Sequence, residues 1–123
     1  MIKNINAEKA YLSLKENTNS KLIDVRTAAE WKDDGYADLN SIGHEVHFIS
    51  WVNEDGSPND LFIEEVKRLS IQADDSLFFI CRSGVRSQHA GNFLNSNLKL
   101  ENVFNIEGGM EFGWKSFNLP LKS

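Results

Sequence analysis

Four consecutive residues, Leu77-Phe78-Phe79-Ile80, are all apolar. A strand with one face in water alternates apolar and polar side chains, whereas a central parallel strand is covered on both faces and is apolar throughout. We therefore expect residues 77–80 to form the centre of a sheet that other elements cover from both sides.

Other short apolar runs have the length and composition of strands. They are Leu22–Val25, Val46–Ile49 and Val103–Ile106. Segments with helical spacing of apolar residues lie between these runs. Strands that alternate with helices are typical of an α/β domain, so the sequence predicts an α/β fold with a mainly parallel sheet.

Capping residues indicate where several helices begin. Asn6 is expected to cap a helix over Ala7–Lys15, and Thr27-Ala28-Ala29-Glu30 has the form of a capping box. Asp60 is expected to cap a helix over Leu61–Leu69.

Two further helices are expected near the C-terminus, one from Ser87 to about Asn97 and one from Gly109 to Phe117. Phe93 and Phe112 are predicted to be among their inward-facing residues. The segment Gly35–Pro58 is rich in glycine and is predicted to be mostly turn, interrupted by one strand.

The length and composition fit one domain over residues 1–123, with 41% hydrophobic residues for a single core. The net charge of −5 argues against a nucleic-acid surface, because phosphate binding needs clustered positive charge. No apolar stretch approaches the roughly 20 residues of a membrane span, and the N-terminus lacks the apolar core of a signal peptide. A single cysteine forms no internal disulfide, so we expect a cytoplasmic protein.

The chemistry is predicted to lie at Cys81, which follows the central strand directly. In open α/β sheets, ligands bind beyond the carboxyl ends of the strands. Gly84 lets the next loop curl and aim several N–H groups at one point, and a helix from Ser87 adds its unpaired N–H groups. Arg82 and Arg86 add full positive charges. Such a setting favours a nucleophilic thiolate and an anionic substrate beside it.

Structural interpretations of the same residues remain open at this point. Cys81 is then a buried strand end, and both neighbouring arginines are solvated. For Asp24 the structural interpretation is preferred, in which Asp24 or Glu30 accepts hydrogen bonds from Arg26 and fixes a turn. The histidines lack the paired spacing of a metal site; they are His44, His47 and His89.

The segment Cys81-Arg82-Ser83-Gly84-Val85-Arg86-Ser87 resembles the active-site loop of the rhodanese-like sulfurtransferases. Two further blocks resemble the family in order and spacing, so the likeness covers nearly the whole chain. The first is Leu22–Thr27 followed by Glu30-Trp31, and the second is Asn105–Gly109 followed by Trp114 and Leu119–Leu121. The resemblance departs at Gly35–Leu39, which lacks the histidine and proline that many members carry there; this affects the local backbone and the donor preference.

The resemblance implies a five-stranded, mainly parallel sheet flanked by helices on both faces, with a first strand near Ile2–Ile5. It also implies that Cys81 is the catalytic nucleophile and becomes a persulfide. Sulfur would come from a small anionic donor such as thiosulfate and leave to cyanide or a thiol, without a metal or an organic cofactor. The residues implied to bind the substrate are Arg82, Ser83, Gly84, Val85 and Arg86.

Two other functions use the same loop. A persulfide carrier would receive sulfur from one protein and pass it to another, with little turnover of small molecules, and Gly35–Pro58 is a candidate docking surface for such partners. A cysteine phosphatase is less favoured, because its arginine follows the cysteine after five residues. Here Arg86 follows Cys81 after four, which makes a tighter cradle suited to one sulfur atom.

Overall fold

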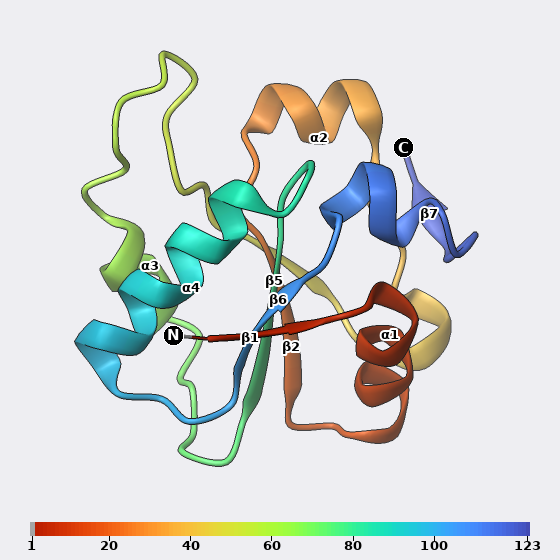
Figure 1. The fold of residues 1–123 in the computed structure, drawn as a ribbon, viewed down its shortest axis with the longest axis horizontal. Coiled ribbons are helices and arrows are strands. Elements are labelled where there is room, and N and C mark those ends of the chain that lie inside the picture. Colours follow the sequence, from red (N-terminus) through yellow and green to blue (C-terminus); the bar gives the residue numbers. More distant parts are fainter. Residues whose placement is uncertain (1) are drawn as a thin grey trace.

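The structure, a computed structural model, describes residues 2–123, and Met1 lies outside the described residues. Its main sheet has five parallel strands in the order β1-β6-β5-β2-β4 (Figure 1). The strands are β1 (Lys3–Ile5), β2 (Ser20–Asp24), β4 (Val46–Phe48), β5 (Ser76–Ile80) and β6 (Val103–Ile106). The apolar run Leu77–Ile80 lies in β5, at the centre of the sheet, and its side chains are fully buried or nearly so. The prediction from its composition is confirmed.

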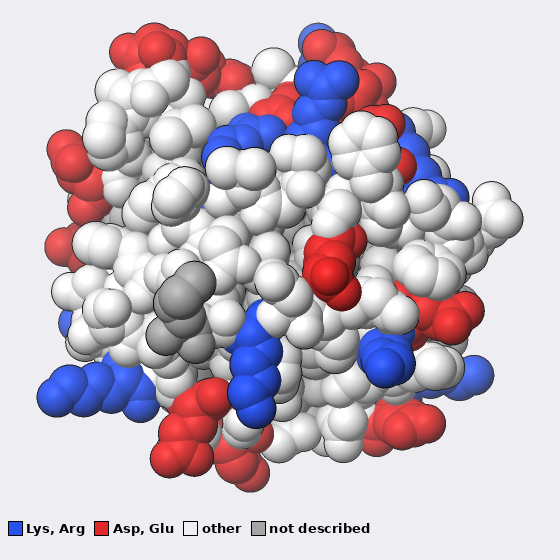
Figure 2. All heavy atoms as spheres, viewed as in Figure 1, with Lys and Arg blue, Asp and Glu red and all other residues white. Residues whose placement is uncertain are grey.

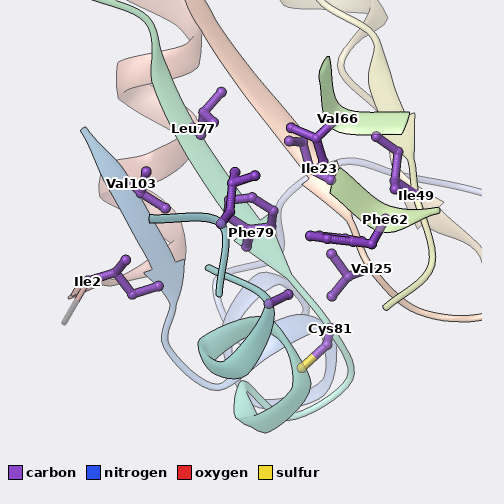
Figure 3. Packing of buried hydrophobic residues seen from close by; sticks show 12 residues of the cluster. Ile2, Ile23, Val25, Ile49, Phe62, Val66, Leu77, Phe79, Cys81 and Val103 are labelled. Carbon is purple, nitrogen blue, oxygen red and sulfur yellow. The ribbon is translucent and has the colours of Figure 1, made fainter. Parts of the chain in front are cut away.

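Helical elements cover both faces of this sheet. The helical elements of the fold are α1 (Ala7–Glu16), α2 (Ala28–Asp34), the 3₁₀ turn η1 (Asn40–Ile42), α3 (Phe62–Lys67), α4 (Val85–Leu98) and the π-helical segment η2 (Gly109–Trp114). On one face α3 and α4 pack in the cluster drawn in Figure 3, with Phe62 against Phe79. On the other face α1 and η2 pack over Phe78. The fold is therefore α/β, as expected.

Two of the three predicted caps are present. Asn6 Oδ1 accepts a hydrogen bond from the Lys9 amide, and Thr27 forms a reciprocal capping box with Glu30. The prediction for Asp60 was wrong: α3 begins at Phe62 and no side chain caps it. The side chain of Asn59 instead accepts from the Leu61 amide at 3.1 Å, and this turn takes up the residues that were expected to start the helix.

Phe93 and Phe112 are also placed differently from the prediction, because they are 44% and 72% exposed. In α4 the face toward the sheet carries Ala90 and Leu94, and Phe93 lies at its edge beside Trp51. In η2 the backbone is a π-helix, which has more residues per turn than an α-helix. The α-helical spacing therefore fails there, and Trp114 is buried while Phe112 points outward.

The segment Gly35–Pro58 contains more regular structure than its glycine content indicates. Besides β4 it holds β3 (Tyr36–Ala37), which pairs in antiparallel orientation with β7 (Leu121–Lys122). A pairing of two residues leaves no periodic apolar signal, and its partner strand lies near the other end of the chain.

Among residues 2–123, none of the helices has both the length and the apolar character needed to cross a bilayer. On the face shown in Figure 2, Lys and Arg side chains are scattered among Asp and Glu and form no continuous basic patch. This distribution agrees with the acidic net charge of −5.

Candidate active site

Cys81 lies at the junction between β5 and the loop that leads into α4. Its side chain is 1% exposed, and Figure 3 shows the sulfur pointing toward the start of α4. Sγ accepts a hydrogen bond from the Gly84 amide at 3.0 Å and lies 3.2 Å from Ser87 Oγ. The thiol is thus enclosed by its own loop and by the first turn of the helix.

The loop after Cys81 turns sharply at Gly84, whose φ of +102° is a conformation that side chains disfavour. Gly84 is also the N-cap residue of α4, and no side chain caps this helix. The first amides of α4 are therefore free of a capping oxygen and leave a positive end of the helix dipole beside the sulfur. Arg82, Ser83 and Val85 are exposed on the outside of this turn.

The start of η2 holds the loop from behind. The amide of Met110 donates to the carbonyl of Cys81 at 2.8 Å, and the amide of Glu111 donates to that of Arg82 at 3.0 Å. Gly109, with φ of +57°, packs so closely here that an added Cβ would lie 2.7 Å from the carbonyl carbon of Arg82. The second glycine of the Gly108-Gly109 pair therefore fixes the backbone on which the cysteine sits.

Arg86 is paired with an acidic residue of another helix. Its guanidinium forms two hydrogen bonds with the Glu30 carboxylate of α2, at 2.6 and 2.7 Å. Partial burial alone would raise the pKa of Glu30, but the hydrogen bonds from Arg86 and Thr27 outweigh it and lower the pKa to about 2. The hydrogen bonds with Glu30 also raise the pKa of Arg86, and the charges of Cys81 and Asp24 contribute to this shift.

Replacing Glu30 by glutamine is expected to lower the free energy of unfolding by about 1 kcal/mol at neutral pH. The pKa of Glu30 is about 2 in the folded protein against an ordinary 4.5, so this stabilisation is complete above pH 4.5 and is lost as the pH falls toward 2. Urea unfolding of the wild type and of Glu30→Gln should show that their unfolding free energies differ less at about pH 3 than at neutral pH.

Glu64→Gln, at an exposed position of α3, is the control for that measurement and should change the unfolding free energy little at either pH. A gap between wild type and Glu30→Gln that stays constant down to about pH 3 would contradict the ion-pair origin of the stabilisation.

Asp24 and Arg26 form a buried ion pair in which each side chain is 1% exposed. Arg26 also donates to the carbonyl of Gly35 at 2.8 Å, which fixes the chain after α2. The structural interpretation of Asp24 is therefore confirmed. Glu30 pairs with Arg86 rather than with Arg26.

Sequence reasoning missed the roles of Ser87 and Asn105. Ser87 Oγ contacts both Cys81 Sγ and Asn105 Oδ1, and both side chains are buried. In the sequence, Asn105 stands out as a polar residue inside the apolar run Val103–Ile106, but its hydrogen-bond partners cannot be read from that pattern.

An open pocket of about 380 Å³ lies against the outer side of this loop. Gly84 and Asn105 form part of its wall, together with His89 from the next turn of α4. His89 is thus at the rim of a pocket beside the loop. The other two histidines lie elsewhere, with His44 lining a separate pocket beside β3.

Comparisons with known proteins agree with this geometry. A family model described as "Rhodanese-like domain" matches residues 7–116. The chain is 41% identical over 125 residues to "Uncharacterized protein RC0915" from Rickettsia conorii, covering 97% of this chain and 96% of that one. The crystal structure of Rv0390 from M. tuberculosis is 32% identical with a TM-score of 0.86, covering 98% of this chain and 96% of that one.

A more distant structure shares the fold alone. It is the solution structure of the polysulfide-sulfur transferase homodimer from Wolinella succinogenes, at 22% identity. Its TM-score is 0.68, and the match covers 98% of this chain and 78% of that one.

Proposed function

Because the chain belongs to the family of rhodanese-like domains, we propose that it is a sulfurtransferase in which Cys81 carries the transferred sulfur as a persulfide. The donor is a sulfane-sulfur compound such as thiosulfate, and the acceptor is a thiophile, either cyanide or a thiol. The observation that carries this proposal is the contact of the only cysteine with the Gly84 amide at the N-terminus of α4. An amide donor and a helix N-terminus both favour negative charge on sulfur.

The reaction consists of two displacements at sulfur. In the first, the thiolate of Cys81 attacks the outer sulfur of thiosulfate, the S–S bond of the donor breaks, and sulfite leaves with the bonding electrons. In the second, cyanide attacks the outer sulfur of the persulfide and leaves as thiocyanate, which restores the thiolate. A covalent intermediate between two such steps gives ping-pong kinetics.

The loop residues 82–86 supply the proposed substrate site. Their backbone N–H groups are proposed to bind the outer sulfur, in line with the Gly84 amide, which donates to Cys81 Sγ at 3.0 Å. Arg82 lies exposed at the start of the loop. Arg86 is held by Glu30 through two of its N–H groups, and its guanidinium has further N–H groups for the anionic end of the donor. The pair therefore fixes the direction of the guanidinium before a donor arrives.

Burial of the thiol has a consequence for this reaction. With Cys81 1% exposed, a donor reaches Sγ only when the loop that encloses it moves. Loading of the cysteine is thus expected to depend on the opening of residues 82–86 as well as on the chemistry at sulfur.

Intact-mass spectrometry after incubation with thiosulfate tests the proposal. The protein should gain the mass of one sulfur atom, and cyanide should then remove it. A parallel incubation with a cysteine desulfurase and cysteine separates the enzyme from a persulfide carrier. Loading by the desulfurase but not by thiosulfate would replace the small-molecule reaction by transfer between proteins, and no loading from either source would overturn the proposal. The physiological donor and the cytoplasmic location stay predictions.

A further inference from the structure

Asn105 is a buried amide at the end of β6, 5% exposed, and the reaction outlined above does not use it. Both ends of its side chain are engaged. Oδ1 lies within hydrogen-bond distance of Ser87 Oγ. Nδ2 donates toward three oxygens, Gly84 O at 3.2 Å, Asn4 Oδ1 at 3.0 Å and Gln88 Oε1 at 3.1 Å.

The carbonyl of Gly84 fixes which end of this amide faces which neighbour. A backbone carbonyl only accepts hydrogen bonds, so the NH₂ group of Asn105 must point toward it. Oδ1 then points toward Ser87 and offers its hydroxyl only an acceptor. The amides of Asn4 and Gln88 can turn to suit either orientation, but the Gly84 carbonyl cannot.

Ser87 therefore stands between two acceptors that compete for one proton. Its Oγ lies within reach of Asn105 Oδ1 and 3.2 Å from Cys81 Sγ. A hydroxyl donates one hydrogen bond at a time. When the Ser87 hydroxyl donates to Asn105, it cannot also donate to the sulfur. The contact between Ser87 Oγ and Cys81 Sγ is then a hydrogen bond only if Cys81 is a protonated thiol whose S–H donates to Ser87 Oγ.

We propose that Asn105 is a positioning residue that holds the Ser87 proton away from the sulfur and so controls when Cys81 ionises. When the thiol loses its proton to solvent, the Ser87 hydroxyl turns to the thiolate, and the buried Oδ1 of Asn105 loses its donor. An unsatisfied buried acceptor opposes this change. In the persulfide the charge lies on the outer sulfur, so Ser87 returns to Asn105 without that opposition.

Other charged residues surround the loop, and they are unchanged in the variants whose alkylation is compared below. They are Arg82 and Arg86 on the loop and α4, Asp24 and Arg26 at the end of β2, Glu30 on α2 and Glu111 at the start of η2.

The rate of Cys81 alkylation by iodoacetamide, measured against pH, reads the thiolate directly. Asn105→Leu removes the competing acceptor at similar volume and is expected to lower the midpoint of this profile by about one pH unit. In a Ser87→Ala background the same replacement should leave the midpoint unchanged, because it acts through the hydroxyl. Gln88→Leu, which contacts only the nitrogen end of Asn105, is the matched control and should also leave it unchanged.

An equal shift with and without the Ser87 hydroxyl, or an equal shift in Gln88→Leu, would overturn the inference, because the effect would then come from the loop backbone. If Asn105→Leu does not fold, Asn105→Asp provides the test of the inference instead. It keeps the acceptor and adds negative charge, so it must raise the midpoint, and a fall overturns the inference.

This inference rests on Cys81 being the reactive residue, and the two fail in different ways. Loading by a sulfur donor reports the proposed function, whereas alkylation needs no donor. If the wild-type protein loads normally but replacing Asn105 leaves the alkylation profile unchanged, the inference is wrong and the proposed function stands.

Discussion

Replacement of Cys81 by serine is expected to abolish both transfer of sulfur to cyanide and the gain of one sulfur mass after exposure to thiosulfate. The chain has one cysteine, so no second thiol can accept the sulfur. A serine hydroxyl at this position is not ionised near neutral pH and does not form a persulfide. The loss should therefore be complete within the sensitivity of the assay.

The same variant should remain folded, which separates this chemistry from stability. Serine is close to cysteine in shape, and its oxygen can keep the contacts with the Gly84 amide and Ser87 Oγ. We expect its free energy of unfolding to fall by about 1 kcal/mol, measured by urea denaturation.

The combined variant Cys81→Ser with Ser87→Cys is a matched control, because it retains one thiol at a neighbouring site. It should load at least about 100-fold more slowly, since the relocated sulfur lies away from the Gly84 amide. Loading at the wild-type rate would show that a thiol anywhere in this pocket suffices.

Replacement of Gly109 by alanine is expected to have the largest effect on stability. The new methyl group would lie 2.7 Å from both the carbonyl carbon and the oxygen of Arg82, and even closer to the carbonyl oxygen of Cys81. These are backbone atoms in a hydrogen-bonded turn, so they cannot move aside without breaking the amide contacts of Met110 and Glu111. We expect a loss of about 3 kcal/mol or more, seen as a fall in Tm of about 10 °C.

Two other glycines separate the causes of this loss. Gly56→Ala places a side chain at a similar positive φ of +85° but in open space, so it measures backbone strain alone, about 1 kcal/mol. Gly91→Ala meets mainly the flexible end of Ile2, which can shift. A loss in Gly109→Ala no greater than that in Gly56→Ala would contradict the tight packing of η2 against the Cys81 loop.

The centre of the sheet and the position of Cys81 could be predicted because they depend on local pattern. Leu77–Ile80 is apolar at every residue, and this alone distinguishes a strand covered on both faces. The caps at Asn6 and Thr27 were predictable for a similar reason, since a cap joins residues within one turn. Where the local geometry was unusual, as in the π-helix of η2, the same reasoning placed Phe112 in the core when it is exposed.

The amino-acid sequence by itself determined the layered α/β architecture and the place of a single thiol at the end of its central strand, because alternating periods of hydrophobicity encode which faces are buried. Only the tertiary structure decided the partners of the site. Glu30 and Arg86 are 56 residues apart, and Ser87 and Asn105 are 18 apart. Such pairs form only after separate helices and strands dock, and hydrogen bonds between them depend on distances that no periodic pattern records.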